Sequence, residues 1–544
     1  MERYIVRMQN AITLSETDLK EHVFDQDGVH FSHPLSPLFA SYMIPAMTEG
    51  THGAMEFLKA PMRQFICRVH EGYFYQAIVP ANGDPKTIES EHQAVIEPML
   101  GHQRERLVEE LNSLLLPLHE EVVQLTAAIQ DAASAKKALV RLQEIYQIFW
   151  EAHFRIVLPR AAAGFAFQNT FCEAFPDADP NEAYTLLVGE MNKTLESDRA
   201  LWSLAEQAKQ DRDVMAALAA EDMGQALQSS PHTAWFNEAV SEFLQQYGWR
   251  TVYAHEFLNK TWVEDRNYCL TVLKGYIDQG FDFDAHWNAV VRRRNERVQE
   301  LAGSIADPNL KETFWTTWKL AIEAWPIDED HHFYIDAMLP ARSRLLVLAA
   351  SDVLVASGML DDREDIHFLY LDEVLDALDG HPPDQVRDLV AARREEHRAQ
   401  KERVPAPRLG GNADEEGEAN PLSVLVFGAN SPALVGATRE VRGFPASAGQ
   451  YIGPVRVVRG PEEFFKVRRG DVLVCRSSAP SWTGLFAVAG AVITETGGIL
   501  SHAATVAREY GIPCIVGTRE ATHVFQDGQS VLVDGTEGVA TVQD

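Results

Sequence analysis

The feature that most constrains the fold of this chain is a strand-like run that enters a paired-glycine turn and continues into a helix-like segment. Residues 489–493 are apolar, Gly497 and Gly498 follow, and the helical pattern begins at Ser501 and His502. A helix start has unpaired N–H groups and the positive end of the helix dipole, which favour a bound anion and a neutral imidazole. His502 is therefore a candidate nucleophile beside an anion site.

Neighbouring residues supply further groups that suit a phosphate. The paired glycines let backbone amides approach an anion closely, and Ser501 is the expected N-cap. Thr494, Thr496 and Thr505 add hydroxyl donors. The same pattern also fits an ordinary strand–turn–helix crossover with an incidental histidine, so the spacing alone leaves both interpretations open.

A longer stretch favours the functional interpretation. Residues 497–518 read G-G-x-x-S-H-A-A-x-x-A-R-E-x-G-I-P-x-x-x-G-T. This stretch, with the surrounding residues 443–544, resembles the phosphohistidine signature of the swivelling domain in phosphoenolpyruvate-utilising enzymes, which include rifampicin phosphotransferase and phenylphosphate synthase. The resemblance implies that His502 is transiently phosphorylated. The residues that it implies for phosphate binding are Thr494, Gly497, Gly498, Ser501, Arg508 and Arg476, with Ser477 and Ser478 as secondary candidates.

Composition limits the possible partners and locations. The chain has 544 residues, 46% of them hydrophobic, which is enough for two to four domains. A formal net charge of −31 argues against binding to nucleic acid or an anionic membrane surface. Five dispersed cysteines fit reduced thiols, and the longest apolar stretch, residues 345–360, is too short to span a bilayer. With no signal-peptide pattern at the start, a soluble, cytoplasmic protein is expected.

The patterning predicts a multidomain fold, in which a mostly α-helical region is followed by a C-terminal α/β region. The resemblance implies that the first is a substrate domain and the second a swivelling phosphohistidine domain. Residues 1–90 show strand-like signals, including two runs around a His70–Glu71 turn, and form the N-terminal mixed segment of the substrate domain. Residues 91–396 have the apolar spacing of helices and form the helical substrate-binding domain. Residues 397–441, rich in proline, glycine and charge, are predicted as a linker or hinge. Residues 442–544 alternate short strands and helices.

One stretch of the helical region resembles a segment of rifampicin-phosphotransferase-like enzymes. Residues 244–265 are similar to their Y-G-H-R…E…P-x-W-x-E-D pattern, but Trp249 replaces the usual histidine, which puts a catalytic role at that position in doubt. Arg250 is expected to meet the phosphoryl group, while His255 or Glu256 accepts a substrate proton. The alternative is an Arg250–Glu256 ion pair that only holds the loop. Residues 34–38, P-L-S-P-L, resemble the start of the same family's substrate region.

A second stretch combines histidines, carboxylates and arginines. Residues 328–336 read D-E-D-H-H-F-Y-I-D, Arg342 and Arg344 follow, and residues 361–374 again resemble the family. His331 and His332 are candidates for acid/base catalysis, because histidine titrates near neutral pH. The two arginines are candidates for substrate and phosphate binding.

A metal site is the rival interpretation for the same stretch. Asp328, Asp330, His331 and His332 are potential ligands, but consecutive side chains seldom converge and no helical HxxxH spacing is present. No metal-binding residue is therefore predicted in this chain. Mg²⁺ is expected only with the phosphates of ATP, on the nucleotide-binding component.

The family resemblance also suggests a reaction. No P-loop or ATP-grasp-like glycine loop is recognisable, so an ATP-grasp partner subunit is expected to bind ATP and Mg²⁺ and to phosphorylate His502, with AMP and phosphate as products. The phosphohistidine then phosphorylates a hydroxyl of a small, phenol-like substrate, a class suggested by aromatic residues at 154, 165, 167, 171 and 334. The alternatives are a self-contained ATP-dependent kinase and a non-catalytic phosphorelay or regulatory module.

Overall fold

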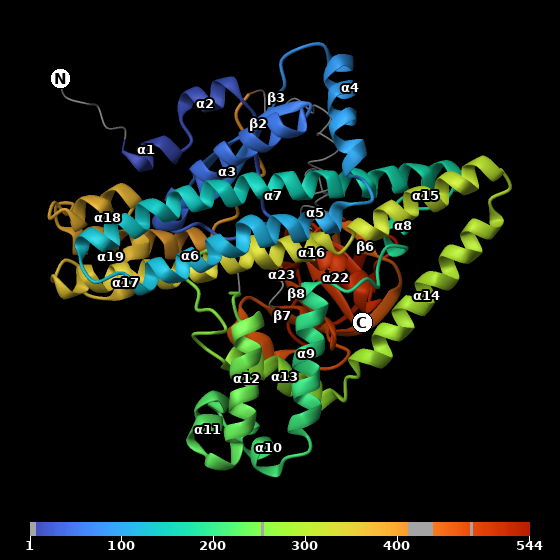
Figure 1. The fold of residues 1–544 in the computed structure, drawn as a ribbon. Coiled ribbons are helices and arrows are strands. Elements are labelled where there is room, and N and C mark those ends of the chain that lie inside the picture. Colours follow the sequence, from blue (N-terminus) through green and yellow to red (C-terminus); the bar gives the residue numbers. More distant parts are fainter. Residues whose placement is uncertain (1–6, 252–254, 412–438, 479–481, 544) are drawn as a thin grey trace. The chain divides into compact units, whose positions relative to one another are not determined.

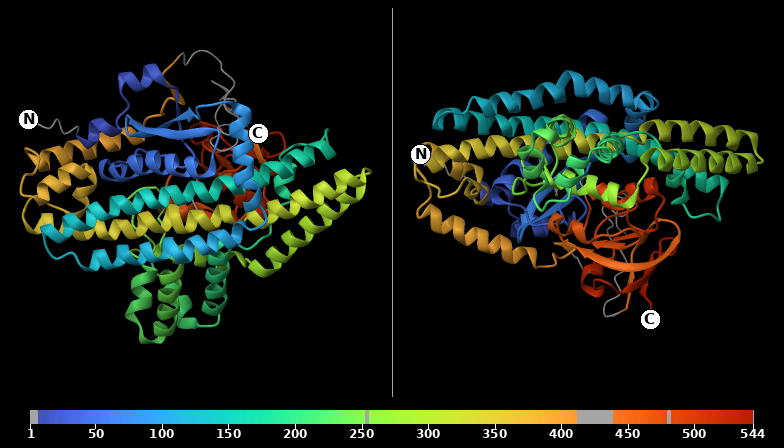
Figure 2. Two further views of the ribbon diagram at one scale, coloured as in Figure 1. Left: turned by 45° about the horizontal axis from the view of Figure 1, so that its top comes forward. Right: turned by 90° about the horizontal axis from the view of Figure 1, so that it is seen from below.

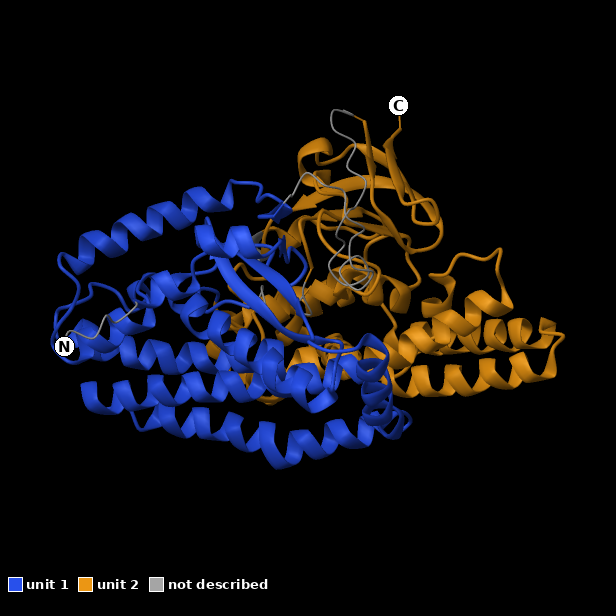
Figure 3. Cartoon of the chain, turned by 90° about the horizontal axis from the view of Figure 1, so that it is seen from above, with its two compact units in different colours: residues 1–159, 255–259, 334–418 blue, residues 160–254, 260–333, 419–544 orange. Residues whose placement is uncertain are grey.

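The computed structural model describes residues 7–251, 255–411, 439–478 and 482–543. The chain forms two compact units (Figure 3): unit 1 comprises residues 1–159, 255–259 and 334–418, and unit 2 comprises residues 160–254, 260–333 and 419–544. This division differs from the predicted boundaries, because the helical region 91–396 contributes to both units. One point of division is Pro159 inside helix α7 (Ala132–Ala174), a residue that cannot donate a helical hydrogen bond.

Unit 1 combines helices with a small antiparallel sheet of strand order β2-β3-β1-β4. Figure 1 labels β2 and β3 of this sheet. The predicted hairpin is confirmed: β2 (Met62–His70) and β3 (Tyr73–Pro80) flank a turn at Glu71 and Gly72, which both have positive φ. The other strands are β1 (Phe24–Gln26) and β4 (Arg408–Leu409). The helices include α1 (Met8–Ile12), α2 (Glu16–Glu21), α3 (Pro37–Leu58), α4 (Pro85–Ile96), α5 (Gln103–Glu110), α6 (Leu116–Ala127), α17 (Met338–Ala356), α18 (Leu371–Leu378) and α19 (Val386–Lys401).

The predicted linker at 397–441 is ordered at both of its described ends. Residues 397–401 complete α19, where His397 Nε2 bonds to the Pro34 carbonyl at 2.9 Å. Residues 408–409 pair with β1, and residues 440–442 form strand β5 (Glu440–Arg442). Long-range contacts therefore order segments whose composition alone predicts a tether. Residues 412–438 lie outside the described part of the chain.

The helices of unit 2 gather around α9 (Lys193–Ala208), which packs against α12, α13, α14 and α16. Helices α14 and α15 form a hairpin (Figures 1 and 2). The other helices of this part are α8 (Glu182–Thr185), α10 (Arg212–Leu218), α11 (Met223–Ser229), α12 (Ala234–Tyr247), α13 (Asn267–Gln279), α14 (Phe283–Ser304), α15 (Pro308–Ala324) and α16 (Ile327–His331). Aromatic residues of α7 and α15, including Phe167, Phe171 and Phe314, are buried in one hydrophobic cluster, as expected for amphipathic helices.

The described part of the C-terminal sheet has the strand order β5-β12-β11-β7-β8-β9-β10-β6. Its centre is parallel: β7 (Gln450–Val458), β8 (Val472–Cys475), β9 (Ala491–Thr494) and β10 (Cys514–Val516) run in one direction. Strands β8, β9 and β10 are buried throughout, which is typical of a parallel sheet covered on both faces. The antiparallel members are β6 (Phe444–Ser447), β11 (Ser530–Asp534), β12 (Val539–Val542) and β5.

Short helices connect these strands and cover the sheet: α21 (Thr483–Phe486), α22 (His502–Tyr510) and α23 (Ala521–Val524). The predicted fold class, mostly helical with a C-terminal α/β region, is confirmed. None of the helices in the described ranges has the length and apolar character that crossing a membrane requires.

Candidate active site

His502 is the first residue of α22, directly after the turn that follows β9. This is the carboxyl end of a parallel strand, where open α/β sheets place their ligands. Ser501 stands at the N-cap as predicted, but its side chain makes no capping bond, and its buried Oγ has no hydrogen-bond partner among the described residues. Gly497 has φ +116°, and a Cβ there would lie 2.8 Å from Ser501 Oγ, so the turn needs glycine at this position.

The imidazole of His502 is held by a carboxylate from the helical part of unit 2. Nδ1 of His502 lies 3.0 Å from Oε1 of Glu329 in α16, and both side chains are buried, with 8% and 2% exposed. Glu329 Oε2 accepts a second bond, at 2.6 Å, from the Thr194 hydroxyl of α9. Because Glu329 accepts at Nδ1, that nitrogen carries the proton and the lone pair is at Nε2. Nε2 is buried and has no hydrogen-bond partner in the described ranges.

Charges around this pair keep Glu329 ionised. Burial by itself raises the pKa of Glu329, but the charge and hydrogen bond of His502, the charge of His332 and the Thr194 bond outweigh it and lower the pKa to about 2. A carboxylate paired in this way stabilises positive charge on the imidazole. His502 can therefore become cationic during a reaction without leaving an isolated buried charge.

Arg250 supplies a cation to the same region. It follows the C-terminus of α12, is 1% exposed, and its guanidinium lies 5.3 Å from the ring centroids of both Trp262 and Phe333. Burial lowers its pKa to about 10, against the opposing charges of Asp198 and Glu329. Its Nε and one terminal nitrogen are buried without hydrogen-bond partners in the described part of the chain. A cation with unused donors near two carboxylates suits an incoming phosphoryl group.

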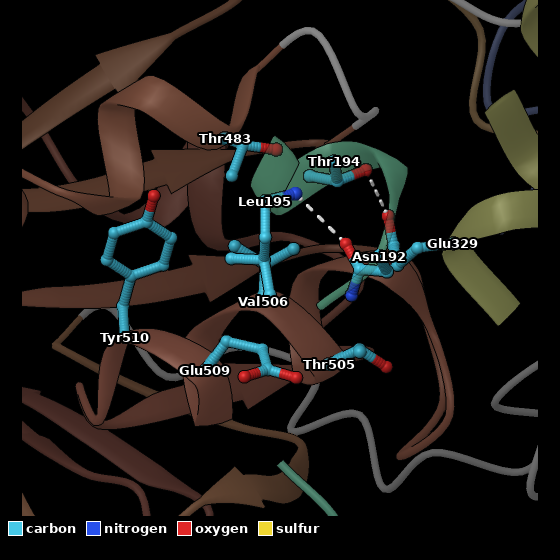
Figure 4. Close-up of a pocket in the computed structure, with 9 residues that line it drawn as sticks. All are labelled: Asn192, Thr194, Leu195, Glu329, Thr483, Thr505, Val506, Glu509 and Tyr510. Atoms are coloured by element: carbon cyan, nitrogen blue, oxygen red, sulfur yellow. Dashed lines mark hydrogen bonds between the residues drawn. The ribbon is translucent and has the colours of Figure 1, made fainter. Parts of the chain in front are cut away.

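A small pocket of about 190 Å³, including space open to solvent, adjoins the pair (Figure 4). Its lining residues are Asn192, Thr194, Leu195, Glu329, Thr483, Thr505, Val506, Glu509 and Tyr510. Thr505, Val506 and Glu509 share one face of α22 with His502, because residues three, four and seven positions apart align on a helix.

Polar atoms in this pocket have unused hydrogen-bonding capacity. Glu509 Oε2 accepts from the Gly189 N–H at 2.9 Å, whereas Glu509 Oε1 and Thr505 Oγ1 are buried without partners among the described residues. Burial raises the pKa of Glu509 to about 8. The raised pKa favours the protonated form of Glu509, which can donate a hydrogen bond.

A buried contact joins the end of α22 to α9. The Tyr510 hydroxyl donates to Oδ2 of Asp198 at 2.9 Å. Burial raises the pKa of Asp198 to about 7, although the Tyr510 bond and the charge of Arg250 lower it. The first and last residues of the histidine helix thus both contact carboxylates of the helical part.

The other predicted phosphate-binding residues of this domain shape the turn. The Thr494 hydroxyl donates to the Thr496 carbonyl at 2.7 Å, and the Arg476 carbonyl accepts from the Thr496 N–H. Arg508 donates to the Ile499 carbonyl at 2.6 Å, while its Nε and other terminal nitrogen are buried without partners in the described ranges. Gly498 also acts through its backbone, since its carbonyl accepts from the N–H of the N-cap serine.

The loop that was predicted as a secondary phosphate contact is described only in part. Residues 479–481 lie outside the described ranges, whereas Ser477 and Ser478 lie inside them. The Ser478 hydroxyl is buried without a hydrogen-bond partner among the described residues.

Four predicted substrate-domain residues belong to unit 1. Glu256 accepts from the Ser36 N–H at 2.7 Å and from the Ser36 hydroxyl at 2.6 Å, so it closes the N-terminus of α3. Its Oε1 also accepts from the Phe257 N–H at 2.6 Å. Arg344 donates to both oxygens of Glu364, at 2.6 and 2.9 Å. These contacts give Glu256 and Arg344 structural roles, which the family pattern did not predict.

The remaining two residues lie in buried surroundings of the same unit. His255 is 3% exposed and its ring centroid lies 4.8 Å from that of Phe31 and 5.8 Å from that of Trp150. Burial lowers the pKa of Arg342, although the charge of Glu120 raises it. Acid/base or substrate-binding roles for these two residues stay predictions.

His331 and His332 belong to unit 2, and the structure corrects one premise about them. Their ring centroids are 4.2 Å apart, and ligand atoms of Asp328, His331 and His332 all lie within 4.8 Å of one another. The expectation that consecutive side chains do not converge is wrong here, because positions i, i+3 and i+4 share one face of a helical turn.

Several site residues were missed from the sequence: Glu329, Thr194, Asp198, Glu509 and Tyr510. Glu329 lay inside the stretch that was singled out, but a separation of 173 residues from His502 leaves no local pattern that marks their pairing. Glu509 could have been predicted from its spacing, since it is seven residues after His502 and thus on the same face of the helix.

Comparison with known proteins finds two family models that match parts of the chain. Residues 467–538 match the family described as PEP-utilising enzyme, mobile domain. The chain carries a mobile domain of the phosphoenolpyruvate-utilising enzymes. Residues 153–324 match the rifampicin phosphotransferase fourth domain, which covers most of the helices that pack around the mobile domain in unit 2.

Curated relatives share more of the chain. It is 32% identical over 539 residues to the uncharacterised phosphotransferase YvkC of Bacillus subtilis, a match of 98% of this chain and 63% of that protein. It is 31% identical to chondramide synthase cmdD of Chondromyces crocatus, over 95% of this chain and 14% of that protein. A rifampicin phosphotransferase of Streptomyces is 36% identical over 36% of this chain and 21% of its own length. The chain thus spans less than two thirds of each of these relatives.

Proposed function

We propose that this chain is the phosphohistidine and acceptor-binding component of an ATP-dependent phosphotransferase. In this proposal His502 receives a phosphoryl group that an ATP-grasp partner takes from ATP, and passes it to a hydroxyl of a small molecule. The observation that carries the proposal is the His502–Glu329 pair, in which Nδ1 is bonded at 3.0 Å and the buried Nε2 has no hydrogen-bond partner in the described chain. The mobile-domain match and the phosphotransferase relatives support the same reaction class.

The protonation state of His502 sets the first step. With its proton on Nδ1, His502 attacks phosphorus with the Nε2 lone pair, so an N–P bond forms while the donor's P–O bond breaks. The phosphorylated ring keeps the Nδ1 proton and is cationic. Glu329 stabilises that charge at a distance of 3.0 Å, in a site where water does not screen it.

In the second step the His502 imidazole is the leaving group. The N–P bond breaks as the acceptor hydroxyl forms a P–O bond, and the hydroxyl proton must go to a base. His332, whose charge affects Glu329, is the first candidate, and His331 and His255 are the others. Arg250 neutralises charge on the phosphoryl oxygens, because its unused donors are buried near the same carboxylates.

Nucleotide chemistry is assigned to the partner. ATP and Mg²⁺ bind to the ATP-grasp component in this proposal, and AMP and phosphate are the co-products. Movement of residues 442–544 between the partner and the helical part would couple the two steps. The mobile-domain match supports that movement, and the buried contacts of α22 with α9 and α16 represent the arrangement for transfer to the acceptor.

A phenol-like hydroxyl compound is proposed as the acceptor. Two of the aromatic residues that suggested this class, Phe167 and Phe171, are fully buried in a hydrophobic cluster and belong to the core. The proposal therefore rests on the resemblance to the family and on the similarity to rifampicin phosphotransferases.

The test separates loading of His502 from use of ATP. Phosphoramidate, a direct donor to histidine, should add one acid-labile phosphoryl group to the wild-type chain and none at this position in His502→Ala. ATP labelled at the β or γ phosphate should then label His502 only when an ATP-grasp component is added. Labelling by ATP without that component would favour the self-contained kinase, and a phosphohistidine that no phenol or other hydroxyl compound discharges would favour the relay module.

A further inference from the structure

We propose that Asp328, His331 and His332 form a binding site for a divalent transition-metal ion, zinc by the chemistry of its ligands. The three residues lie in unit 2, at the junction of α16 with the π-helical turn that starts at His332. Their ligand atoms, one from each residue, all lie within 4.8 Å of one another. Three donors that converge to this extent can surround one ion after small side-chain movements.

The helix geometry explains the convergence. Asp328 and His331 are three positions apart and Asp328 and His332 are four apart, so all three side chains occupy one face of a single turn. Asp328 and His331 are buried, with 7% and 1% exposed, while His332 is half-buried. An ion can therefore reach the two buried ligands from the side of His332, the more accessible ligand.

Two of the three ligands already have the outer partners that metal ligands usually have. His331 Nδ1 donates to the Ile327 carbonyl at 2.9 Å, which assigns the proton to Nδ1 and the lone pair to Nε2. Asp328 Oδ2 lies 3.2 Å from a terminal nitrogen of Arg160, so its carboxylate is oriented from outside the cluster. Arg160 also lies over the Trp325 ring at 4.7 Å, so its guanidinium has a second contact that does not involve Asp328.

The donor set selects the type of ion. Two imidazole nitrogens and one carboxylate oxygen suit zinc and its first-row neighbours, whereas magnesium prefers oxygen ligands and keeps its water. Three protein ligands leave a fourth position open for water or a hydroxyl. This inference rests on the proposed function in one respect: an ion bound here would occupy the lone pairs of His331 and His332, so they would not act as bases. The ion would instead lower the pKa of an acceptor hydroxyl near Glu329, the partner of His502.

The test measures metal binding without any phosphoryl transfer, so its failure is distinguishable from failure of the proposed function. The full-length chain, without a tag and freed of metal, is titrated with Co²⁺ and with Zn²⁺. Calorimetry measures the affinity and stoichiometry, and Co²⁺ absorption reports the type of ligand. One equivalent should bind, with a visible Co²⁺ spectrum typical of nitrogen and oxygen ligands. Asp328→Asn and His332→Gln should each weaken binding at least tenfold.

The matched control is Asp330→Asn in the same helical turn, because Asp330 is outside the cluster and accepts from the Lys193 N–H at 2.7 Å. This variant should bind the ion as the wild type does. Circular dichroism of every variant establishes that the fold is intact, and His332→Gln, at the half-buried position, is the substitution that perturbs packing least. The absence of a stoichiometric site in the wild type, or less than tenfold weakening in either ligand variant, would overturn the proposal.

Discussion

The pairing of Glu329 with His502 makes a sharp prediction about Glu329→Gln. In the wild type the carboxylate accepts from Nδ1 at 3.0 Å, which assigns the proton to Nδ1 and makes Nε2 the nucleophile. A glutamine side chain has the same length as glutamate and can still accept from the Thr194 hydroxyl, which donates to Glu329 at 2.6 Å in the wild type. It loses the negative charge that stabilises a cationic phosphoimidazole, and its NH₂ group can donate to Nδ1 and reverse the tautomer.

The magnitude follows from the burial of the pair. A hydrogen bond to a charged group contributes about 1.5–3 kcal/mol, and both side chains here are less than a tenth exposed, so solvent screens the bond little. That range corresponds to roughly 10- to 150-fold in the rate of phosphorylation by phosphoramidate. The isomer should change as well: the wild type should give only Nε2-phosphohistidine, and the variant a mixture with the Nδ1 isomer. Phosphorus NMR distinguishes the two isomers in the intact chain.

Glu312→Gln provides the control, because Glu312 is an exposed carboxylate on α15 of the same unit. This variant should keep the wild-type rate and isomer. If Glu329→Gln is phosphorylated as fast as the wild type and only at Nε2, the carboxylate does not orient His502 and the reasoning fails.

Three further substitutions test the surroundings of the site. Gly484→Ala in α21 would place a Cβ 2.1 Å from Val272 Cγ1 of α13. We expect it to lower the free energy of unfolding by roughly 1–3 kcal/mol and to speed hydrogen exchange in α13. Adding Val272→Ala should restore both values, and failure of the double variant to do so would contradict the predicted clash. Gly497→Ala, at φ +116°, should cost about 1–3 kcal/mol in urea unfolding and slow His502 phosphorylation, whereas unchanged values would show that the turn tolerates a side chain. Asp198→Asn should make the stability of the chain less dependent on pH, measured by urea unfolding at about pH 5 and about pH 8.

The local features of the site could be predicted from the sequence because they depend on neighbours in the chain. The apolar run, the paired glycines and the helical spacing predicted β9, the turn and α22, and these are confirmed with His502 as the first helical residue. The β2–β3 hairpin was predictable for the same reason, since its turn residues adjoin its strands. Periodicity and turn chemistry report short-range structure directly.

The partners of His502 could not be predicted, because they depend on packing between distant segments. Glu329 was one of several carboxylates in its stretch, and only the orientation of α16 against α9 selects it. Glu256 shows the same dependence on the fold: the family pattern suggested a proton acceptor, and the structure adds that its oxygens accept bonds from Ser36 at the start of α3. A motif states which residues are present, whereas the free hydrogen-bonding capacity of each residue depends on the fold.

Asp198 makes the stability of the contact between α22 and α9 depend on pH. Burial raises its pKa from 3.8 to about 7, so between these values the folded state holds a proton that the unfolded state has released. Stability should therefore fall as pH rises from about 4 to about 7 and stay low above that, by at most roughly 4 kcal/mol for a shift of about three units. Asp198→Asn can still accept from Tyr510 but cannot ionise, so its unfolding midpoint relative to wild type should increase between about pH 5 and about pH 8. Glu509, whose pKa is raised to about 8, acts in the same direction but is common to both chains and cancels in the difference. An equal difference at both pH values would show that Asp198 is ionised in the folded chain, and that the Tyr510 contact joining the histidine helix to α9 does not respond to pH.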